Sequence, residues 1–308
     1  MKSKKLGLFI PTYKRDYNRV SASIWIRVLQ LKKYYEMFGI KVYINNPFIL
    51  YDIAIVYRAS SSKILNLIKF LKKTSKKVYW DTCVNYYDLH SHTNSVQVAI
   101  TKEISKIVDG VIVSTNAIEE KAKLYNNNVF VMDDPIDRNY FKYKKDKDKI
   151  NFKNPIFGWS GVSIKAKILN NYKNYIKKLL IISDKPPILD VEYEFYKWRY
   201  ESFPYLLTKC DIALLPREFE NDPYNIAHSS FKALVFAMCE IPIIANKLPS
   251  YEKLAEYYGG IVFLEDVEND IEKAIEKIKN SDLSNKKLLD FYSCENQAFR
   301  LLKYLGCI

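Results

Sequence analysis

The sequence predicts an α/β protein of two domains, each built on a parallel sheet with helices on both faces. Three observations lead to this prediction. The chain has 308 residues, more than one compact core usually contains, which favours two domains. Apolar runs of strand length alternate with amphipathic runs of helix length, which is typical of parallel sheets. The alternation is interrupted by a charged run at residues 142–153 and then starts again.

The first half contains six predicted strands, at residues 6–11, 41–45, 52–57, 77–80, 110–114 and 129–132. Helices are predicted between them at residues 21–38, 62–73, 96–108 and 116–125. Gly39 ends the first helix because glycine is a natural helix stop. Asn116, with Glu119 three residues later, forms a capping pattern at the start of the last helix. Residues 1–150 are therefore assigned to a first domain.

The second half repeats the alternation after the charged run, which we interpret as an exposed linker. Strands are predicted at residues 156–159, 210–216, 241–245 and 261–264, and residues 176–183 pass from helix to strand. Helices are predicted at residues 231–239, 251–258 and 267–279. Residues 151–308 form the second domain. Parallel sheets bind ligands at the carboxyl ends of their strands, so a cleft between the two halves is the expected site.

Composition and charge exclude several protein classes. Hydrophobic residues make up 48% of the chain and charged residues 27%, which excludes a wholly disordered chain. The net charge of +13 lies in residues 1–150, where 27 Lys and Arg face 14 Asp and Glu. Such asymmetry predicts an anionic partner, either nucleic acid or lipid headgroups, although a lysine-rich composition alone would also produce it. Five cysteines without a C-x-x-C spacing exclude a disulfide scaffold. No apolar run approaches membrane-spanning length, and we expect a soluble, cytoplasmic protein.

Common nucleotide and metal motifs are absent from the sequence. Neither G-x-G-x-x-G nor G-x-x-x-x-G-K-[ST] occurs, and G-x-S-x-G is also missing. The D-x-D pair Asp146 and Asp148 lies in the charged run, where solvation explains it. His90 and His92 have no further ligand at a standard zinc spacing. We therefore expect neither a bound metal nor a cofactor.

Residues 211–260 carry the most specific pattern, a strand ending in Pro216, an acidic loop, a helix and a further strand. This stretch resembles the donor-binding region of GT-B type glycosyltransferases similar to family 4. The ten-residue interval from Lys232 to Pro242 matches, as do Ala237, Met238, Ile243, Ile244, Ala245, residues 248–251 and Gly259-Gly260. Weaker matches are Gly158–Gly161, Ser23-x-x-x-Arg27 with Gly39, residues 110–115 and residues 134–137.

The resemblance implies the GT-B fold, two Rossmann-like domains whose parallel sheets face each other across a cleft. Residues 1–150 would be the basic, acceptor-side domain, and residues 151–308 would bind a nucleotide-sugar donor. The implied activity is transfer of a hexosyl group to a surface-polysaccharide or glycolipid acceptor, with retention of the anomeric configuration and without a metal.

Two departures from the family pattern leave an alternative open. The family's two glutamates, spaced E-x7-E, would fall on Ala227 and Val235, and the glycine before the last strand of the pattern is Glu240. A non-catalytic GT-B-like protein that binds a glycan or a partner would also fit these departures.

The helix start near Phe231 is the expected phosphate site. Helix N-termini attract anions, yet this one is flanked by His228 and Lys232. A diphosphate would resolve this conflict, with Ser229 and Ser230 as helix caps. The predicted donor-binding residues are Ser160, Gly161, Lys165, Lys167, Arg217, His228, Ser229, Ser230 and Lys232. The alternative is that His228 and Lys232 pair with Glu218, Glu220 or Asp222.

Candidate catalytic residues are Asp81, which ends a strand, His90 in the polar loop that follows, and Glu220 in the acidic loop. Asp88 and His92 share the loop with His90, and ordinary loop polarity also explains them.

The predicted partners are the donor, a lipid-linked or polysaccharide acceptor, and an anionic membrane surface that would make the protein peripheral. On the helix at residues 62–73, Lys63, Lys69, Lys72 and Lys73 flank an apolar face, with Lys76 and Lys77 beyond it. The positive charge and 25 tyrosines also suggest a nucleic-acid binder, but no DNA- or RNA-reading motif occurs, so we expect no nucleic-acid partner.

Overall fold

The computed structural model describes residues 3–10, 21–58, 60–90, 92–217 and 222–308. The chain folds into two compact units. The first comprises Met1–Pro135, Phe219–Ser229 and Tyr292–Ile308, and the second comprises Ile136–Glu218 and Ser230–Phe291. The units therefore differ from a single division at residue 150, because the C-terminal segment and a short stretch before residue 230 belong to the first.

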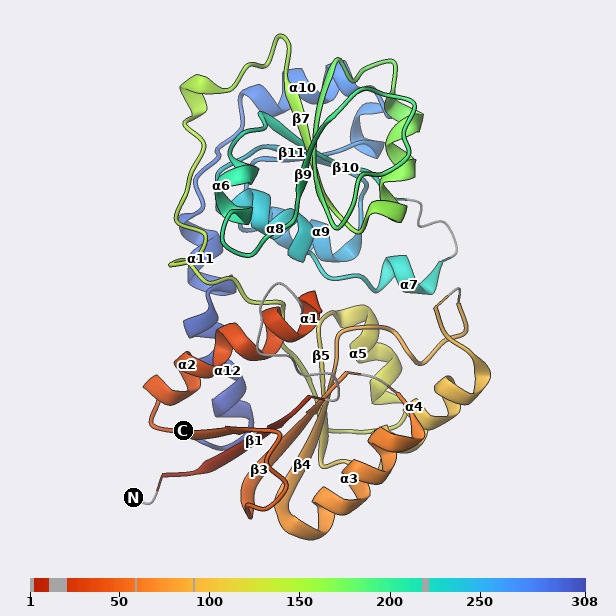
Figure 1. The fold of residues 1–308 in the computed structure, drawn as a ribbon, viewed down its shortest axis with the longest axis vertical. Coiled ribbons are helices and arrows are strands. Elements are labelled where there is room, and N and C mark those ends of the chain that lie inside the picture. The colour runs from red at the N-terminus through yellow and green to blue at the C-terminus, as the bar shows by residue number, and fades with distance from the viewer. Residues whose placement is uncertain (1–2, 11–20, 59, 91, 218–221) are drawn as a thin grey trace. The chain divides into compact units, whose positions relative to one another are not determined.

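The first unit is built on a six-stranded parallel sheet (Figure 1). Its strand order is β2 (Lys41–Ile44), β1 (Lys5–Phe9), β3 (Tyr51–Tyr57), β4 (Ser75–Thr82), β5 (Gly110–Val113) and β6 (Val129–Val131). Its helices are α1 (Ala22–Ile24), the π-helical η1 (Trp25–Leu29), α2 (Gln30–Met37), α3 (Ser62–Thr74), α4 (Ser95–Ile107), α5 (Asn116–Lys123), α7 (Pro223–Ile226) and α12 (Cys294–Tyr304).

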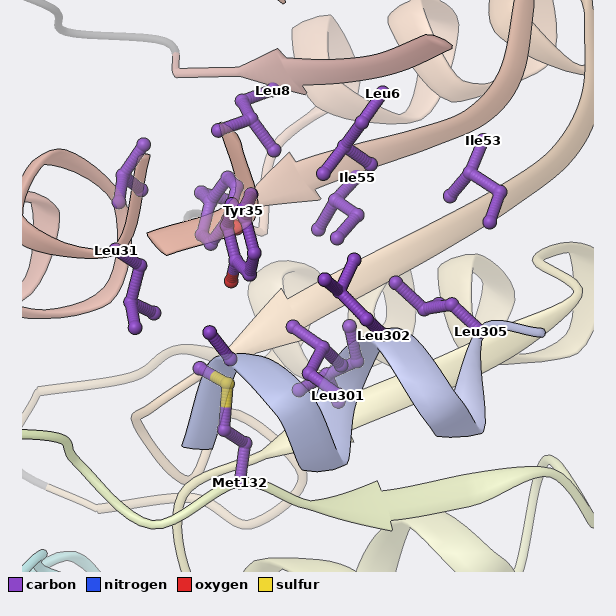
Figure 2. Close-up of a cluster of buried hydrophobic side chains, with 14 of the residues drawn as sticks. Leu6, Leu8, Leu31, Tyr35, Ile53, Ile55, Met132, Leu301, Leu302 and Leu305 are labelled. Atoms are coloured by element: carbon purple, nitrogen blue, oxygen red, sulfur yellow. The ribbon is translucent and has the colours of Figure 1, made fainter. Parts of the chain in front are cut away.

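Two hydrophobic clusters cover the two faces of this sheet. On one face, η1, α2 and α12 pack against β1 and β3, and Figure 2 shows Leu301, Leu302 and Leu305 of α12 beside Ile53 and Ile55. On the other face, α3, α4 and α5 pack against the same strands and β4. The sequence prediction had not assigned α12, although it supplies a large part of the first core.

Local signals explain where these helices begin and end. Gly39 adopts a left-handed φ of 79° directly after α2, as expected for a helix stop. The cap of α5 is Thr115, whose hydroxyl accepts a bond from the Ile118 amide, so the predicted Asn116 cap is one residue late. A threonine in extended conformation fits this position because its oxygen reaches the first-turn amides.

The second unit is built on another six-stranded parallel sheet. Its order is β12 (Ile261–Phe263), β11 (Ile243–Ala245), β10 (Ile212–Leu215), β7 (Ile156–Gly161), β8 (Lys178–Ser183) and β9 (Glu194–Lys197). The helices are η2 (Lys147–Lys149), η3 (Ser163–Tyr172), α6 (Phe203–Leu207), α8 (Phe231–Met238), α9 (Pro249–Ala255), η4 (Glu265–Val267), α10 (Ile271–Lys279) and α11 (Lys286–Tyr292). Two parallel sheets with flanking helices confirm the predicted α/β fold class.

The charged run at residues 142–153 is exposed, as predicted, but it is anchored to the second unit. Lys144 pairs with Glu240 at 2.6 Å, and Lys145 pairs with the buried Asp211 at 3.0 Å. The Lys145 amide also donates to the Cys239 carbonyl. The run is therefore part of the second unit, because its lysines find carboxylates there.

Candidate functional site

The carboxyl end of β7 forms the base of the candidate site in the second unit. Trp159 and Ser160 are buried in the strand, and Gly161 ends it. A Cβ on Gly161 would lie 2.8 Å from the Lys232 ammonium nitrogen and 2.8 Å from the Trp159 ring. Only glycine therefore allows the ammonium and the indole to approach each other at this point.

Lys232 lies in the first turn of α8, which contains no acidic residue. Its ammonium lies 4.2 Å from the centroid of the Trp159 ring. The residue keeps some solvent exposure, but its charged end is pressed between the indole and Gly161. Burial, reinforced by the positive charges of Arg217 and Lys165, lowers the pKa of Lys232 well below its ordinary value.

Arg217 and Lys165 thus act on Lys232 at the start of α8. The group contains predicted donor residues from three separate segments: Lys165 on η3, Arg217 after β10, and Lys232. Lys167, on the same helix as Lys165, is exposed and does not contribute to the shift at Lys232. In the predicted alternative, Lys232 pairs with an acidic residue of the loop. Within the described residues, Lys232 forms no ion pair. Glu218 and Glu220 lie outside those residues. The predicted catalytic role of Glu220 therefore also concerns a part of the chain outside the described residues.

The predicted serine caps of α8 are wrong in their detail. Ser230 occupies the cap position and is buried, but its side chain makes no capping bond. Its backbone, at φ −74° and ψ 0°, is not in the extended conformation from which a serine oxygen reaches the first-turn amides. Ser229 belongs to the first unit, where its hydroxyl donates to Asp134 at 2.6 Å. Within the described residues, neither serine therefore caps the first turn of α8 with its side chain.

Two residues that the sequence prediction missed hold the backbone of Arg217. Asn246, directly after β11, accepts a 2.7 Å bond from the Arg217 amide. Its own amide nitrogen donates to Glu265 at 2.8 Å, and Glu265 also accepts from the Lys247 amide. Both lie at the carboxyl ends of strands, the edge where the fold class predicts ligands, and this position was the available signal.

In the first unit, Asp81 is part of a buried ion-pair network. Its two oxygens accept bonds from Arg27 at 2.8 and 3.1 Å, and Arg27 also binds Asp134 at 2.8 Å. Arg27 and Asp81 are each 1% exposed. Burial alone would lower the pKa of Arg27, but Asp81 and Asp134 outweigh it and hold that pKa above its usual value. As placed here, Asp81 is a counterion, and its predicted catalytic role has no support from the geometry.

All three histidines of the chain lie around Tyr224. The ring centroids of His90, His92 and His228 lie 5.2, 4.4 and 5.4 Å from the Tyr224 ring. His90 donates from Nε2 to the Asn85 carbonyl at 2.6 Å and accepts the His92 amide at Nδ1. Both ring nitrogens of His90 are thus occupied in the neutral form. His228, a predicted donor residue, belongs to this cluster of the first unit.

A hollow of about 600 Å³ lies between the starts of α3 and α4. It was not predicted. Ser60–Ser62, Asn94–Gln97 and Ile100 line it. Neither helix has an acidic residue in its first turn. The hollow offers hydroxyl and amide groups at the carboxyl end of the first sheet.

The described part of the chain contains no group of three or more His, Cys, Asp or Glu side chains arranged to hold a metal ion. Nor does any helix in that part have the length and apolar character needed to cross a membrane.

Comparisons with known proteins identify the fold. No protein-family model matches the sequence, and no curated protein matches it significantly. Among solved structures, sucrose-phosphate synthase from Thermosynechococcus elongatus superposes with a TM-score of 0.68 at 11% identity, covering 97% of this chain and 98% of that one. Anabaena HepE, solved with UDP and glucose, gives 0.63 at 13% identity over 99% and 100%. An α-glucosyltransferase in complex with UDP gives 0.60 at 13% identity over 99% and 96%.

These likenesses establish the fold. The two six-stranded parallel sheets with their flanking helices match the GT-B fold of glycosyltransferases.

Proposed function

We propose that this chain is a glycosyltransferase that takes a sugar from a nucleotide-sugar donor. The observation that carries the proposal is the group of Lys165, Arg217 and Lys232 at the start of α8, on a GT-B fold. Positive side chains gathered at the positive end of a helix dipole attract an anion. A diphosphate, with two charged groups a few ångströms apart, is the anion whose shape and charge fit this position.

The same group supplies the main catalytic effect in the proposed reaction. When the bond between the sugar and the diphosphate breaks, negative charge develops on the leaving phosphate. Fixed cations and helix amides that face this charge stabilise the transition state more than the ground state. No metal or cofactor is needed for this chemistry, since Lys165, Arg217 and Lys232 take the role that a divalent cation would have.

The finer parts of the proposal concern the acceptor and the stereochemistry. The first unit is proposed to bind the acceptor, a surface polysaccharide or glycolipid, and the second unit is proposed to bind the donor. In the proposed hexosyl transfer, which retains the anomeric configuration, the leaving phosphate accepts the proton of the acceptor hydroxyl. This route requires no general base from the first unit. That agrees with the first unit's geometry, because Asp81 pairs with Arg27 and both ring nitrogens of His90 form hydrogen bonds.

Calorimetric titration with UDP tests the phosphate site. Lys232→Met keeps most of the side-chain volume but removes the charge, and we expect UDP affinity to fall by about 1.5–3 kcal/mol, the value of a charge-assisted bond. The matched control is Lys209→Met, which removes another lysine of the second unit that lies over an aromatic ring, 4.6 Å from Tyr196. Equal UDP affinity in the wild type and Lys232→Met would refute the assignment of the site.

A non-catalytic, GT-B-like binding protein is the second candidate. The observation in its favour is that Ala227 and Val235, where the family resemblance places glutamates, are both buried apolar residues. Incubation with a panel of UDP-, GDP-, CMP- and dTDP-sugars separates the two. Release of nucleotide, in transfer or in slow hydrolysis, supports the enzyme, and binding without turnover supports the second candidate.

A further inference from the structure

The short connection between β2 and β3 exposes two large apolar side chains. A parallel crossover usually contains a helix, but here residues 45–50 alone lead from the end of β2 to the start of β3. In this connection Phe48 is 95% exposed and Leu50 is 73% exposed. Side chains of this kind usually lie inside a protein, so two of them on one six-residue connection need an explanation.

The exposure of Phe48 and Leu50 is a fixed feature of the fold, because hydrogen bonds hold the connection at both ends. Asn45 exchanges two bonds with the backbone of Ile10, at 2.6 and 2.9 Å. Further along, the Tyr51 hydroxyl donates to the Asn46 carbonyl at 2.5 Å. Ile49 packs against the hydrophobic cluster on this face of the sheet. With Ile49 turned inward, its two neighbours in the connection are presented to solvent.

Lysines gather at the amino ends of the strands, where Leu50 leads into β3. Leu50 precedes Tyr51, which is paired in the sheet with Ser75, the residue before Lys76 and Lys77. On the neighbouring strands, Lys5 is paired with Lys41. Lys73 ends α3 just before β4 begins.

The few carboxylates at this end of the sheet are already neutralised. Asp52 pairs with Lys76 at 2.6 Å, and Asp109 pairs with Lys72 at 2.8 Å. Within the described ranges, Lys41, Lys73 and Lys77 form no ion pair. Positive charge therefore remains in excess at this end of the sheet, where Leu50 leads into β3.

We infer that this surface, defined by Phe48, Leu50, Lys41, Lys73 and Lys77, docks on an anionic lipid membrane. Apolar side chains that enter the acyl boundary, with lysines at headgroup level, are the combination that binds such a surface. A nucleic-acid backbone would use the lysines but would leave Leu50 without a contact. The inference is independent of the proposed catalytic activity, and it shifts the predicted membrane contact from the length of α3 to one end of the sheet.

Vesicle flotation tests the inference. Wild-type protein should float with phosphatidylcholine–phosphatidylglycerol vesicles at low salt, much less at high salt, and not with phosphatidylcholine alone. A Lys41→Glu/Lys73→Glu/Lys77→Glu variant should lose binding, since each surface lysine contributes about fivefold to the partition coefficient. A Phe48→Ser/Leu50→Ser variant, with its charge unchanged, should also bind at least about tenfold more weakly, because the insertion is lost.

Matched controls separate vesicle binding by this surface from effects of charge or apolar exposure elsewhere on the protein. Lys63→Glu changes a lysine at the opposite end of α3, and Ile188→Ser removes a side chain of the second unit that is 94% exposed. Both should bind like the wild type. In addition, tryptophan emission of Phe48→Trp should gain a blue-shifted component with anionic vesicles, relative to the wild type.

Three results would overturn the inference: no flotation of the wild type at low salt, flotation that the Phe48/Leu50 variant leaves unchanged, or self-association of the wild type that this variant abolishes. The last result would assign the surface to a second copy of the chain. None of these results depends on donor binding, so failure here is distinguishable from failure of the proposed glycosyltransferase function.

Discussion

Lys232 combines three features that usually exclude one another in a lysine. Its ammonium is desolvated, it faces two other cations, and its stabilising neighbour is the face of Trp159. A ring face attracts a cation by about 0.5–2 kcal/mol, far less than a carboxylate in a similar position. Such an arrangement is retained at a cost in stability, which is typical of a group prepared for a ligand.

The lowered pKa of Lys232 predicts that donor binding takes up a proton. Burial and the two neighbouring cations disfavour the charged lysine in the empty site, and a bound diphosphate favours it, so the pKa of Lys232 rises on binding. UDP affinity should therefore increase as the pH falls from about 9 to about 7, above the range where phosphate itself protonates. Calorimetry in buffers of different ionisation enthalpy measures the uptake directly. In Lys232→Met the uptake should vanish, and its persistence would mean that another group takes the proton.

The network of Arg27 with Asp81 and Asp134 is expected to be structural. Arg27→Met should lower the free energy of unfolding by about 3–5 kcal/mol, because it leaves two buried carboxylates without a counterion. The loss should shrink at acid pH. Unpaired, these carboxyls have a folded-state pKa above the unfolded value, so the penalty is present above the folded pKa and absent below the unfolded value of about 3.9. Denaturation at several pH values provides the measurement. Arg27→Met/Asp81→Leu should recover part of the stability, and no recovery would contradict the counterion role.

Helix α8 shows how an element can depart from the sequence pattern that it resembles and still form. It ends at Met238, and Glu240 follows in the left-handed region with a φ of 58°. The family resemblance places glycine at this position, which is the residue that this conformation favours. Glu240 is held there in part by its ion pair with Lys144.

Replacement of Glu240 should therefore reveal the backbone strain. In a Lys144→Met background, where the ion pair is already absent, Glu240→Gly should raise the free energy of unfolding by about 1 kcal/mol, the cost of a left-handed non-glycine residue. Urea denaturation checks this. The control is Glu256→Gly at the end of α9, where φ is −63° and glycine should instead destabilise by up to about 1 kcal/mol. Equal effects at both positions would argue against strain at Glu240.

The strands and helices that sequence analysis predicted are those with a clear apolar period. The central strands β3, β4, β10 and β11 each contain an uninterrupted apolar run, and α3 and α10 have one apolar face. The edge strand β9 was missed because its four residues, Glu194–Lys197, are partly exposed and have no apolar run. The π-helical turn that carries Arg27 was also missed, since a helix with one widened turn has the same apolar face.

The candidate site was predictable only in part, for a related reason. Lys232 was found because a cation in the first turn of a helix contradicts the usual charge preference. Trp159, Asn246 and Glu265 were missed because their roles depend on which strand ends become neighbours, and this is set by the order of strands in the sheet. The engagement of Asp81 by Arg27 was hidden because the two residues are 54 positions apart.

The group of Lys165, Arg217 and Lys232 predicts how sugar transfer responds to removal of divalent metal ions. If Lys165, Arg217 and Lys232 take the role of a divalent cation, sugar transfer should continue at an unchanged rate in excess EDTA. Transfer from the donor identified by the nucleotide-sugar panel, measured with and without chelator after extensive dialysis, checks this. Restoration of a lost activity by Mg²⁺ or Mn²⁺ would show that the cations alone do not neutralise the leaving group.

The placement of α12 on the first unit has a consequence for biosynthesis. Leu301 and Leu302 are fully buried against strands that leave the ribosome almost 250 residues earlier, and each contributes about 1.5–3 kcal/mol to folding. The first sheet therefore cannot complete its core until α12 has been synthesised, even after the whole second unit has emerged. Chains stalled before residue 292 should remain sensitive to protease in the first unit, whereas chains extended by a linker beyond residue 308 should become resistant. A segment synthesised much later thus decides when the first strands become stable.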